Sequence, residues 1–251
     1  MIQFLFRADD LGYSEGVNCG IAKSVIDGLI GSVGVMPNMP SVKHGLELLK
    51  GKKVCLGQHT NICIGKPLTD PRMIPSITQQ NGEFKSSRDY RQATGDFVNL
   101  DEVILEIEAQ YHRFIELTGE PPHYFEGHAV VSANFFRGLE TVARRHGLKY
   151  SDISFDGTPI QIGNSRVHLC DTKECMDPNY DAIKTVIGAI QRAERDSINM
   201  YVCHPGYLDE YILEHSSMTT ARPKEVEMLC APQVKTFLDE KGIQLITYDD
   251  L

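Results

Sequence analysis

The sequence predicts a parallel α/β fold, open or closed, from three observations. Short apolar segments alternate with amphipathic helical segments about seven times, which is typical of β/α units. Polar side chains follow several of the apolar segments, at the strand ends where such folds place ligands. The phosphate-binding motifs GxGxxG and GxxxxGK[ST] do not occur in the sequence, which argues against the common nucleotide-binding folds.

Composition restricts the possible partners and compartment. The net charge of −9 argues against a nucleic-acid partner, and the chain lacks the apolar stretch of about 18 residues that would span a membrane. The 7 cysteines form no CxxC pair, which suits a reducing compartment, so we expect a soluble, cytoplasmic protein. Cys55 and Cys203 lie in apolar segments and are expected to fill the core. Because no linker, solenoid repeat or low-complexity tract is found, we expect one domain over residues 1–251.

The first β/α unit runs from Ile2 to Gly28. Its apolar residues over 2–6 predict a buried strand, and Ser14 is a suitable N-cap for the helix that follows. Asp9 and Asp10 lie between these two elements. Two interpretations stay open for these acids: they stabilise the helix start and the loop, or they take part in chemistry.

The remaining elements follow the same alternation. The predicted strands cover 32–36, 53–57, 122–125, 198–203 and 243–247, with weaker ones at Tyr150 and 167–169. The main predicted helices cover 42–49, 100–118, 135–146, 181–195 and 223–241. Between 64 and 99 the periodicity disappears, and a loop of this length is typical of a lid or a substrate-binding wall.

Several predicted strands end in residues that can bind metal or transfer protons. If the strands are parallel, these ends share one rim, which would gather Asp9, Asp10, His59, Glu126, His128 and His204. Two imidazoles and one carboxylate suit a divalent metal with open coordination positions, and a second carboxylate and histidine suit acid–base catalysis. Each histidine alone could equally be a hydrogen-bonded structural residue or a turn former.

Several sequence motifs together resemble a known family. The motifs are ADDLGYSEGVNCGI (8–21), LGQHTNICIGKPLT (56–69), EAQYHRFIELTGEPPHYFEGH (108–128) and CHPGYLDEYI (203–212). They resemble the YdjC-like carbohydrate deacetylases, which include chitooligosaccharide deacetylase, over nearly the whole chain. The resemblance implies a distorted (β/α) barrel, one divalent metal ion that is commonly magnesium or zinc, removal of acetyl groups from small N-acetylated sugars, and a possible homodimer.

The resemblance also implies residue roles. The metal ligands would be Asp10, His59 and His128, the base Asp9 and the general acid His204, and the expected substrate-binding residues are Tyr13, Asn61, Glu126 and Tyr207. The family pattern DSHxHVH is altered here to EGHAVVS at 126–132, which keeps the metal histidine and replaces the later ones. Two alternatives stay open: the same site hydrolyses another acyl, ester or phosphoester bond, or the protein binds sugars without catalysis.

Overall fold

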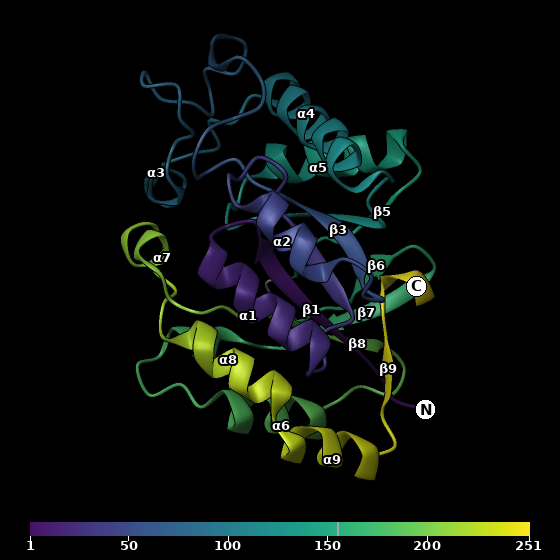
Figure 1. Ribbon diagram of the computed structural model, residues 1–251. Coiled ribbons are helices and arrows are strands. Elements are labelled where there is room, and N and C mark those ends of the chain that lie inside the picture. Colours follow the sequence, from purple (N-terminus) through teal and green to yellow (C-terminus); the bar gives the residue numbers. More distant parts are fainter. Residues whose placement is uncertain (155) are drawn as a thin grey trace.

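The computed structural model describes residues 1–154 and 156–251, and all their side chains except that of Lys173. Its strands form one sheet in the order β5-β4-β3-β2-β1-β8-β7-β6, with β9 also paired to β1. Seven strands of this order, from β5 to β7, run parallel, as predicted, and β6 is antiparallel. The sheet curls into a nearly closed barrel (Figure 1). The strands are β1 (Gln3–Leu11), β2 (Ser32–Val35), β3 (Cys55–Thr60), β4 (Tyr124–Gly127), β5 (Lys149–Tyr150), β6 (Ile160–Ile162), β7 (Ser165–Leu169), β8 (Ile198–Cys203) and β9 (Gln244–Ile246).

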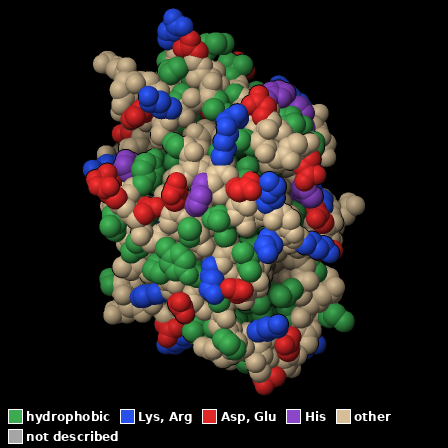
Figure 2. Space-filling model, in the orientation of Figure 1, with side chains coloured by type: hydrophobic (Ala, Val, Ile, Leu, Met, Phe, Trp, Pro, Cys, Tyr) green, Lys and Arg blue, Asp and Glu red, His purple; other side chains and the backbone are tan. Residues whose placement is uncertain are grey.

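Helices cover the outside of the sheet, with α4 and α5 over one end and α6, α8 and α9 over the other (Figure 1). On the face in Figure 2, acidic and basic side chains are interspersed. In the part of the chain that the structure describes, no helix is long and apolar enough to cross a membrane. The helices are α1 (Glu15–Ile26), α2 (Val42–Leu49), α3 (Ser87–Gln92), α4 (Leu100–Thr118), α5 (Ala133–Arg145), α6 (Ala182–Gln191), α7 (Glu210–His215), α8 (Ala221–Cys230) and α9 (Pro232–Glu240), with 3₁₀ turns at Pro71–Met73, Lys173–Met176 and Tyr248–Asp250.

Several predicted boundaries are wrong for identifiable reasons. The first strand continues to Leu11, so Asp9 and Asp10 lie inside the strand, near its end, and not in a loop. The single helix predicted over 223–241 is two helices, because Pro232 lacks an amide hydrogen and begins α9. The helix predicted to reach residue 195 ends at Gln191. Strand β6 and helices α3 and α7 were not predicted, whereas the weak strands at Tyr150 and 167–169 are confirmed.

The alternation of side chains along β1 separates two cores. Phe4, Phe6 and Ala8 face outward and pack with helix residues, whereas Leu5, Arg7 and Asp9 face the barrel interior. The lower interior is an apolar layer in which the Tyr124 and Tyr248 rings stack with centroids 3.6 Å apart. Above that layer, toward the carboxyl ends of the strands, the interior becomes charged.

Candidate metal centre and active site

Three predicted ligand residues meet at the carboxyl ends of the barrel strands. Asp10 Oδ1 lies 3.1 Å from His59 Nε2 and 3.0 Å from His128 Nδ1. The two ring nitrogens lie 2.9 Å apart. The structure therefore brings together the carboxylate and the two imidazoles that the sequence placed on three separate segments.

A β-bulge turns Asp10 toward the two histidines. Strict alternation would direct Asp9 and Asp10 to opposite faces of the sheet. The β1–β2 register pairs Ala8 with Val33 and Leu11 with Val35, so both aspartates lie opposite one residue of β2. Asp10 has a φ of 80°, a conformation that aspartate tolerates better than most residues. The bulge thus lets two neighbouring acids serve one site.

The residue opposite the bulge, Gly34, leaves the room that the cluster occupies. A Cβ on Gly34 would lie 2.7 Å from Glu126 Oε1, 3.1 Å from His59 Cβ and 3.2 Å from Asp9 Oδ1. The first distance is shorter than any real Cβ contact, so any larger residue at 34 would displace the acids or the histidine.

Arg7 neutralises Asp9 inside the barrel. Its Nε lies 2.7 Å from Asp9 Oδ1 and its Nη2 donates to Asp9 Oδ2 at 2.8 Å, a two-point contact that fixes the carboxylate. The same guanidinium lies 3.7 Å from Glu126 and donates to the Tyr248 hydroxyl at 2.9 Å. It also donates to Ser151, which follows β5, so Arg7 connects opposite walls of the barrel.

Arg222 of α8 neutralises Asp10 in the same way. Its Nη2 donates to Asp10 Oδ2 at 2.8 Å, which leaves Oδ1 for the two histidines. Burial opposes ionisation of this carboxyl, but Arg222 and His128 outweigh it and hold the pKa of Asp10 well below its usual range. Asp10 is therefore an anion in the folded protein.

Glu126 sets the tautomer of His59. His59 Nδ1 lies 2.5 and 2.6 Å from the two carboxylate oxygens of Glu126, so this nitrogen carries the proton and donates it. Burial opposes a charged ring, but Glu126 and Asp9 raise the pKa of His59 well above its ordinary value. With Nδ1 protonated, Nε2 is the nitrogen that can bind a metal ion, and the carboxylate behind it orients the ring.

The donor set fits a divalent ion. Adjacent ligands about 2.1 Å from a metal lie about 3.0 Å apart in a facial octahedral set and about 3.4 Å apart in a tetrahedral one. The three donors lie 2.9 to 3.1 Å from one another, close enough for one ion to contact all of them. A second group of possible ligands, Asp9, His59 and Glu126, is less suitable because Arg7 already holds both oxygens of Asp9.

His204 follows β8 on the same rim. Its backbone amide donates to Glu225 Oε2 at 2.5 Å, and its carbonyl accepts from Arg222 at 3.4 Å. Burial lowers the pKa of the His204 ring, although Asp10 and Asp9 oppose that shift. Burial also raises the pKa of Glu225 to about 7. Glu225 and Arg222 therefore fix the backbone of the residue expected to act as general acid.

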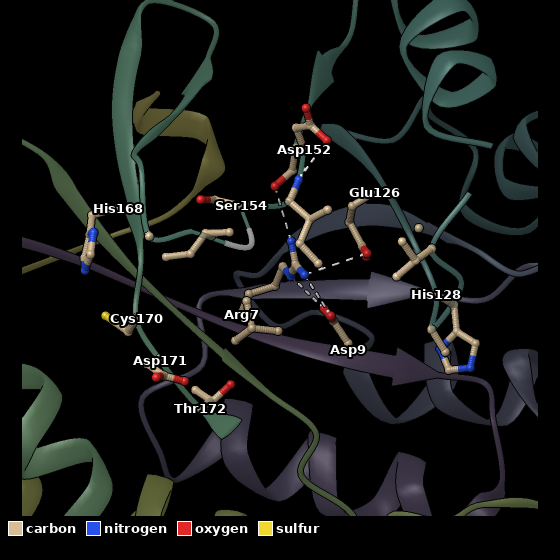
Figure 3. A pocket seen from close by; sticks show the side chains of 18 of the residues that line it. Arg7, Asp9, Glu126, His128, Asp152, Ser154, His168, Cys170, Asp171 and Thr172 are labelled. Carbon is tan, nitrogen blue, oxygen red and sulfur yellow. Dashed lines mark hydrogen bonds and ion pairs between the residues drawn. The ribbon is translucent and has the colours of Figure 1, made fainter. Parts of the chain in front are cut away.

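A cavity of about 890 Å³ opens beside the cluster. Asp9, His59, Glu126, His128 and His204 all contribute to its lining, together with Arg7. Its far wall comes from the segments after β5 and after β7, among them Asp152, Ser154, Cys170 and Thr172 (Figure 3). The cluster thus faces a space large enough for a small sugar.

The four expected substrate-binding residues occupy different environments. Glu126 lines the cavity but is engaged by His59. Tyr13 is buried, packs edge-on against the His128 ring and donates its hydroxyl to the His215 carbonyl. Asn61 is buried and accepts hydrogen bonds from the amides of the loop that follows it. Tyr207 is 39 % exposed, and its amide donates to Gly16. Their contacts with a substrate stay predictions.

The sequence analysis did not single out Arg7, Gly34, Arg222 and Glu225. A signal existed for Arg7, because a charged residue at an inward position of an apolar strand, two residues before Asp9, must share its face. Arg222 and Glu225 had no comparable signal, since they reach the site from a helix far along the chain.

Comparison with known proteins identifies the family of the chain. A family model described as YdjC-like protein matches residues 3–240. The chain belongs to the YdjC-like family. It is 31 % identical to the carbohydrate deacetylase of Geobacillus stearothermophilus, over 97 % of this chain and 96 % of that one. It is 26 % identical to the chitooligosaccharide deacetylase of Yersinia enterocolitica, over 98 % of each chain. The family resemblance predicted from the motifs is confirmed.

Solved structures share the fold of this YdjC-like protein. A crystal structure from Enterococcus faecalis, whose name gives cellobiose-phosphate cleavage as a candidate activity, superposes with a TM-score of 0.86 at 22 % identity, covering 99 % of this chain and 98 % of that one. A family 4 acetyl xylan esterase from Clostridium thermocellum, in complex with a cobalt ion, gives a TM-score of 0.52 at 11 % identity, covering 99 % and 89 %. At these identities the likeness concerns the fold alone, and it confirms the predicted barrel.

Replacing Gly34 with alanine should separate the cluster, because the added methyl meets Glu126 and His59. We expect metal affinity to fall about 10- to 100-fold, with a loss of about 1–3 kcal/mol in the free energy of unfolding. Metal titration and urea denaturation measure both. Gly95→Ala is the matched control, since a Cβ added at Gly95 would have nothing within 4 Å. Unchanged metal affinity in Gly34→Ala would contradict this account of the bulge.

Replacing Arg7 with methionine should leave Asp9 buried without its partner. The expected loss is about 3–5 kcal/mol in the free energy of unfolding, measured by urea denaturation. Arg72→Met serves as control because the Arg72–Asp70 pair is solvent-exposed, and its stability should equal that of the wild type. Equal stability of Arg7→Met and wild type would show that the buried pair has no net effect.

Proposed function

We propose that the protein is a metal-dependent hydrolase that removes N-acetyl groups from small acetylated sugars such as chitooligosaccharides. The observation that carries the proposal is the convergence of Asp10, His59 and His128 at the edge of the cavity. The names of the relatives, carbohydrate and chitooligosaccharide deacetylase, support the substrate class. We also propose that residues 1–251 form one domain, since β1 and β9 belong to the same sheet.

In the proposed mechanism, the residues of the cluster bind the ion, accept a proton or orient a neighbour. Asp10, His59 and His128 hold the ion, whose chemistry in such sites is to polarise a carbonyl oxygen and to lower the pKa of water. Asp9 accepts the proton of the attacking water, with Arg7 keeping the carboxylate in a fixed orientation. Glu126 holds His59 in the tautomer that binds metal.

His204 is proposed to protonate the sugar nitrogen as the C–N bond breaks. Without that proton an amine is a poor leaving group. Because burial lowers the pKa of His204, its protonated form is a stronger acid than an ordinary imidazolium and gives up the proton more readily. Its place on the cavity lining beside the three donors supports this role.

The identity of the ion is proposed as magnesium or zinc. Two imidazoles and a carboxylate can bind either ion. The two imidazole nitrogens suit zinc, and magnesium would need water molecules to complete a mostly oxygen coordination. The further proposal that the protein is cytoplasmic rests on its composition, and that of a homodimer rests on the family resemblance.

A second candidate function is hydrolysis of a different acyl group or of an ester at the same centre. The observation in its favour is an apolar section of the cavity wall, formed by Val131, Phe136, Leu139 and Ile153. Val131 and Ile153 are 64 % and 45 % exposed, so a ligand could cover them. A substrate with a longer acyl chain would gain more from this wall than acetyl would.

The deciding experiment measures acetate release from N,N′-diacetylchitobiose and N-acetylglucosamine. Protein stripped with a chelator should be inactive and should regain activity with magnesium or zinc. Butyryl amides and sugar acetate esters, assayed in parallel, test the second candidate function. Metal binding without product from any of these substrates would favour a sugar-binding protein that lacks catalysis.

Variants of the ligands test the same proposal. His59→Ala and His128→Ala should each lose most bound metal and lower turnover by about a thousandfold, because the metal supplies several kcal/mol of transition-state stabilisation. Bound metal is counted by elemental analysis after dialysis. His112→Ala is the control, since His112 lies exposed on α4. Activity retained in both ligand variants would refute this ligand set.

His204→Asn tests the proton donor. We expect kcat to fall about 10²- to 10⁴-fold while metal content stays at the wild-type level. His168→Asn is a matched control, because His168 lines the far wall of the same cavity (Figure 3). A wild-type kcat in His204→Asn would assign the proton transfer to another group.

A further inference from the structure

A second group of potential metal ligands lies at the opposite end of the barrel. It consists of Cys55, the first residue of β3, His123, which immediately precedes β4, and Asp249 in the C-terminal 3₁₀ turn. Cys55 Sγ lies 3.6 Å from Asp249 Oδ1, and His123 Nδ1 contacts the same oxygen. One donor atom from each residue lies within 4.8 Å of the other two.

The chemistry of these donors points to a particular ion. A thiolate, an imidazole and a carboxylate together are typical zinc ligands, whereas magnesium avoids sulfur. Tetrahedral zinc places a sulfur and an oxygen ligand about 3.5 Å apart, close to the 3.6 Å between Cys55 and Asp249. We propose that Cys55, His123 and Asp249 form a second metal site that binds zinc and is independent of the candidate active site.

The two sites are separated along the same strand. His59 follows Cys55 by four residues on β3, which corresponds to about 13 Å of extended chain. Cys55 and Tyr124 belong to the apolar lower layer of the interior, and that layer lies between the second site and the charged cluster above it. Cys55, His123 and Asp249 are not among the described residues that line the cavity.

The surroundings of the second site provide access for an ion. Cys55 is buried, but the His123 and Asp249 side chains are 34 % and 55 % exposed, so an ion and one water ligand can reach the site from solvent. Burial and the Asp249 carboxylate raise the pKa of the Cys55 thiol to about 12, against the opposing charge of Lys149. The thiol is therefore protonated without metal, and formation of the zinc–sulfur bond releases that proton to solvent.

Zinc at this site would connect three parts of the fold through one ion. Cys55 begins β3, His123 precedes β4, and Asp249 belongs to the turn that ends the described chain. In the structure the turn is already held by the Thr247 cap and by the buried Tyr248 ring. Zinc at this site would thus stabilise the position of the C-terminal segment, and it would lie apart from the candidate active site.

The test counts metal in protein stripped with a chelator and then dialysed against zinc. Wild type should bind two ions, and the His59→Ala/His128→Ala variant should bind one. Asp249→Ala and His123→Ala should each bind one, and they should keep deacetylase activity if the proposed function is correct. Because both side chains are partly exposed, these variants should fold, which circular dichroism verifies.

Cobalt provides a second readout that does not depend on activity. A cobalt–thiolate bond absorbs strongly in the near ultraviolet, and the ligands Asp10, His59 and His128 contain no sulfur. The band should appear in wild type and in His59→Ala/His128→Ala, and it should vanish in Cys55→Ser. Cys63→Ser is the matched control, because Cys63 is a buried cysteine beside His128 and should leave the band in place.

The outcomes separate this inference from the proposed function. One bound zinc in wild type and none in His59→Ala/His128→Ala would overturn the second site and leave the deacetylase proposal intact. A band lost in Cys63→Ser but kept in Cys55→Ser would also overturn it. Two bound ions without acetate release would support the second site and count against the proposed function.

Discussion

The candidate active site depends on the neutralisation of carboxylates inside the barrel. Asp9, Asp10 and Glu126 are all at most 3 % exposed, and isolated buried anions would destabilise the folded state by several kcal/mol each. Arg7 binds Asp9, and Arg222 binds Asp10. Glu126 is left with the His59 ring as its closest partner. Two guanidiniums carry two positive charges against the three carboxylates, so one negative charge remains. A metal ion or protonated histidines can neutralise it.

Strand geometry explains why these charged side chains meet at one place. Period-two alternation turns Arg7 and Asp9 inward on β1, and it turns His59 and Glu126 inward on neighbouring strands. The register pairs His59 with Glu126 directly across β3 and β4. Only Asp10 violates the alternation, and the bulge opposite Gly34 accommodates it. The centre therefore results from regular strands and one local irregularity.

These facts explain which features could be predicted from sequence. The alternation of strands and helices was visible, and so was the occurrence of Asp10, His59, His128 and His204 at successive strand ends, because both are local patterns. The contact of Arg222 with Asp10 spans 212 positions and depends on the curvature of the sheet, which no local pattern encodes. Glycine is needed at position 34 because of side chains at three positions on other strands, and no local sequence pattern indicates such a contact.

The altered segment at 126–132 shows how this family member departs from its pattern without losing the centre. Ser132, at the position of the last family histidine, caps α5 and donates to Asp96 of the long loop. Its side chain thus serves the helix start and the loop, away from the three donors.

Val130, at the position of the other replaced histidine, is 4 % exposed and packs with the core under α4 and α5 while lining the cavity. The changes therefore leave Asp10, His59 and His128 together and make the wall beside them more apolar. In the proposed function the wall would contact the substrate and the three donors would hold the ion, so this departure would bear on the choice of substrate far more than on the capacity to bind metal.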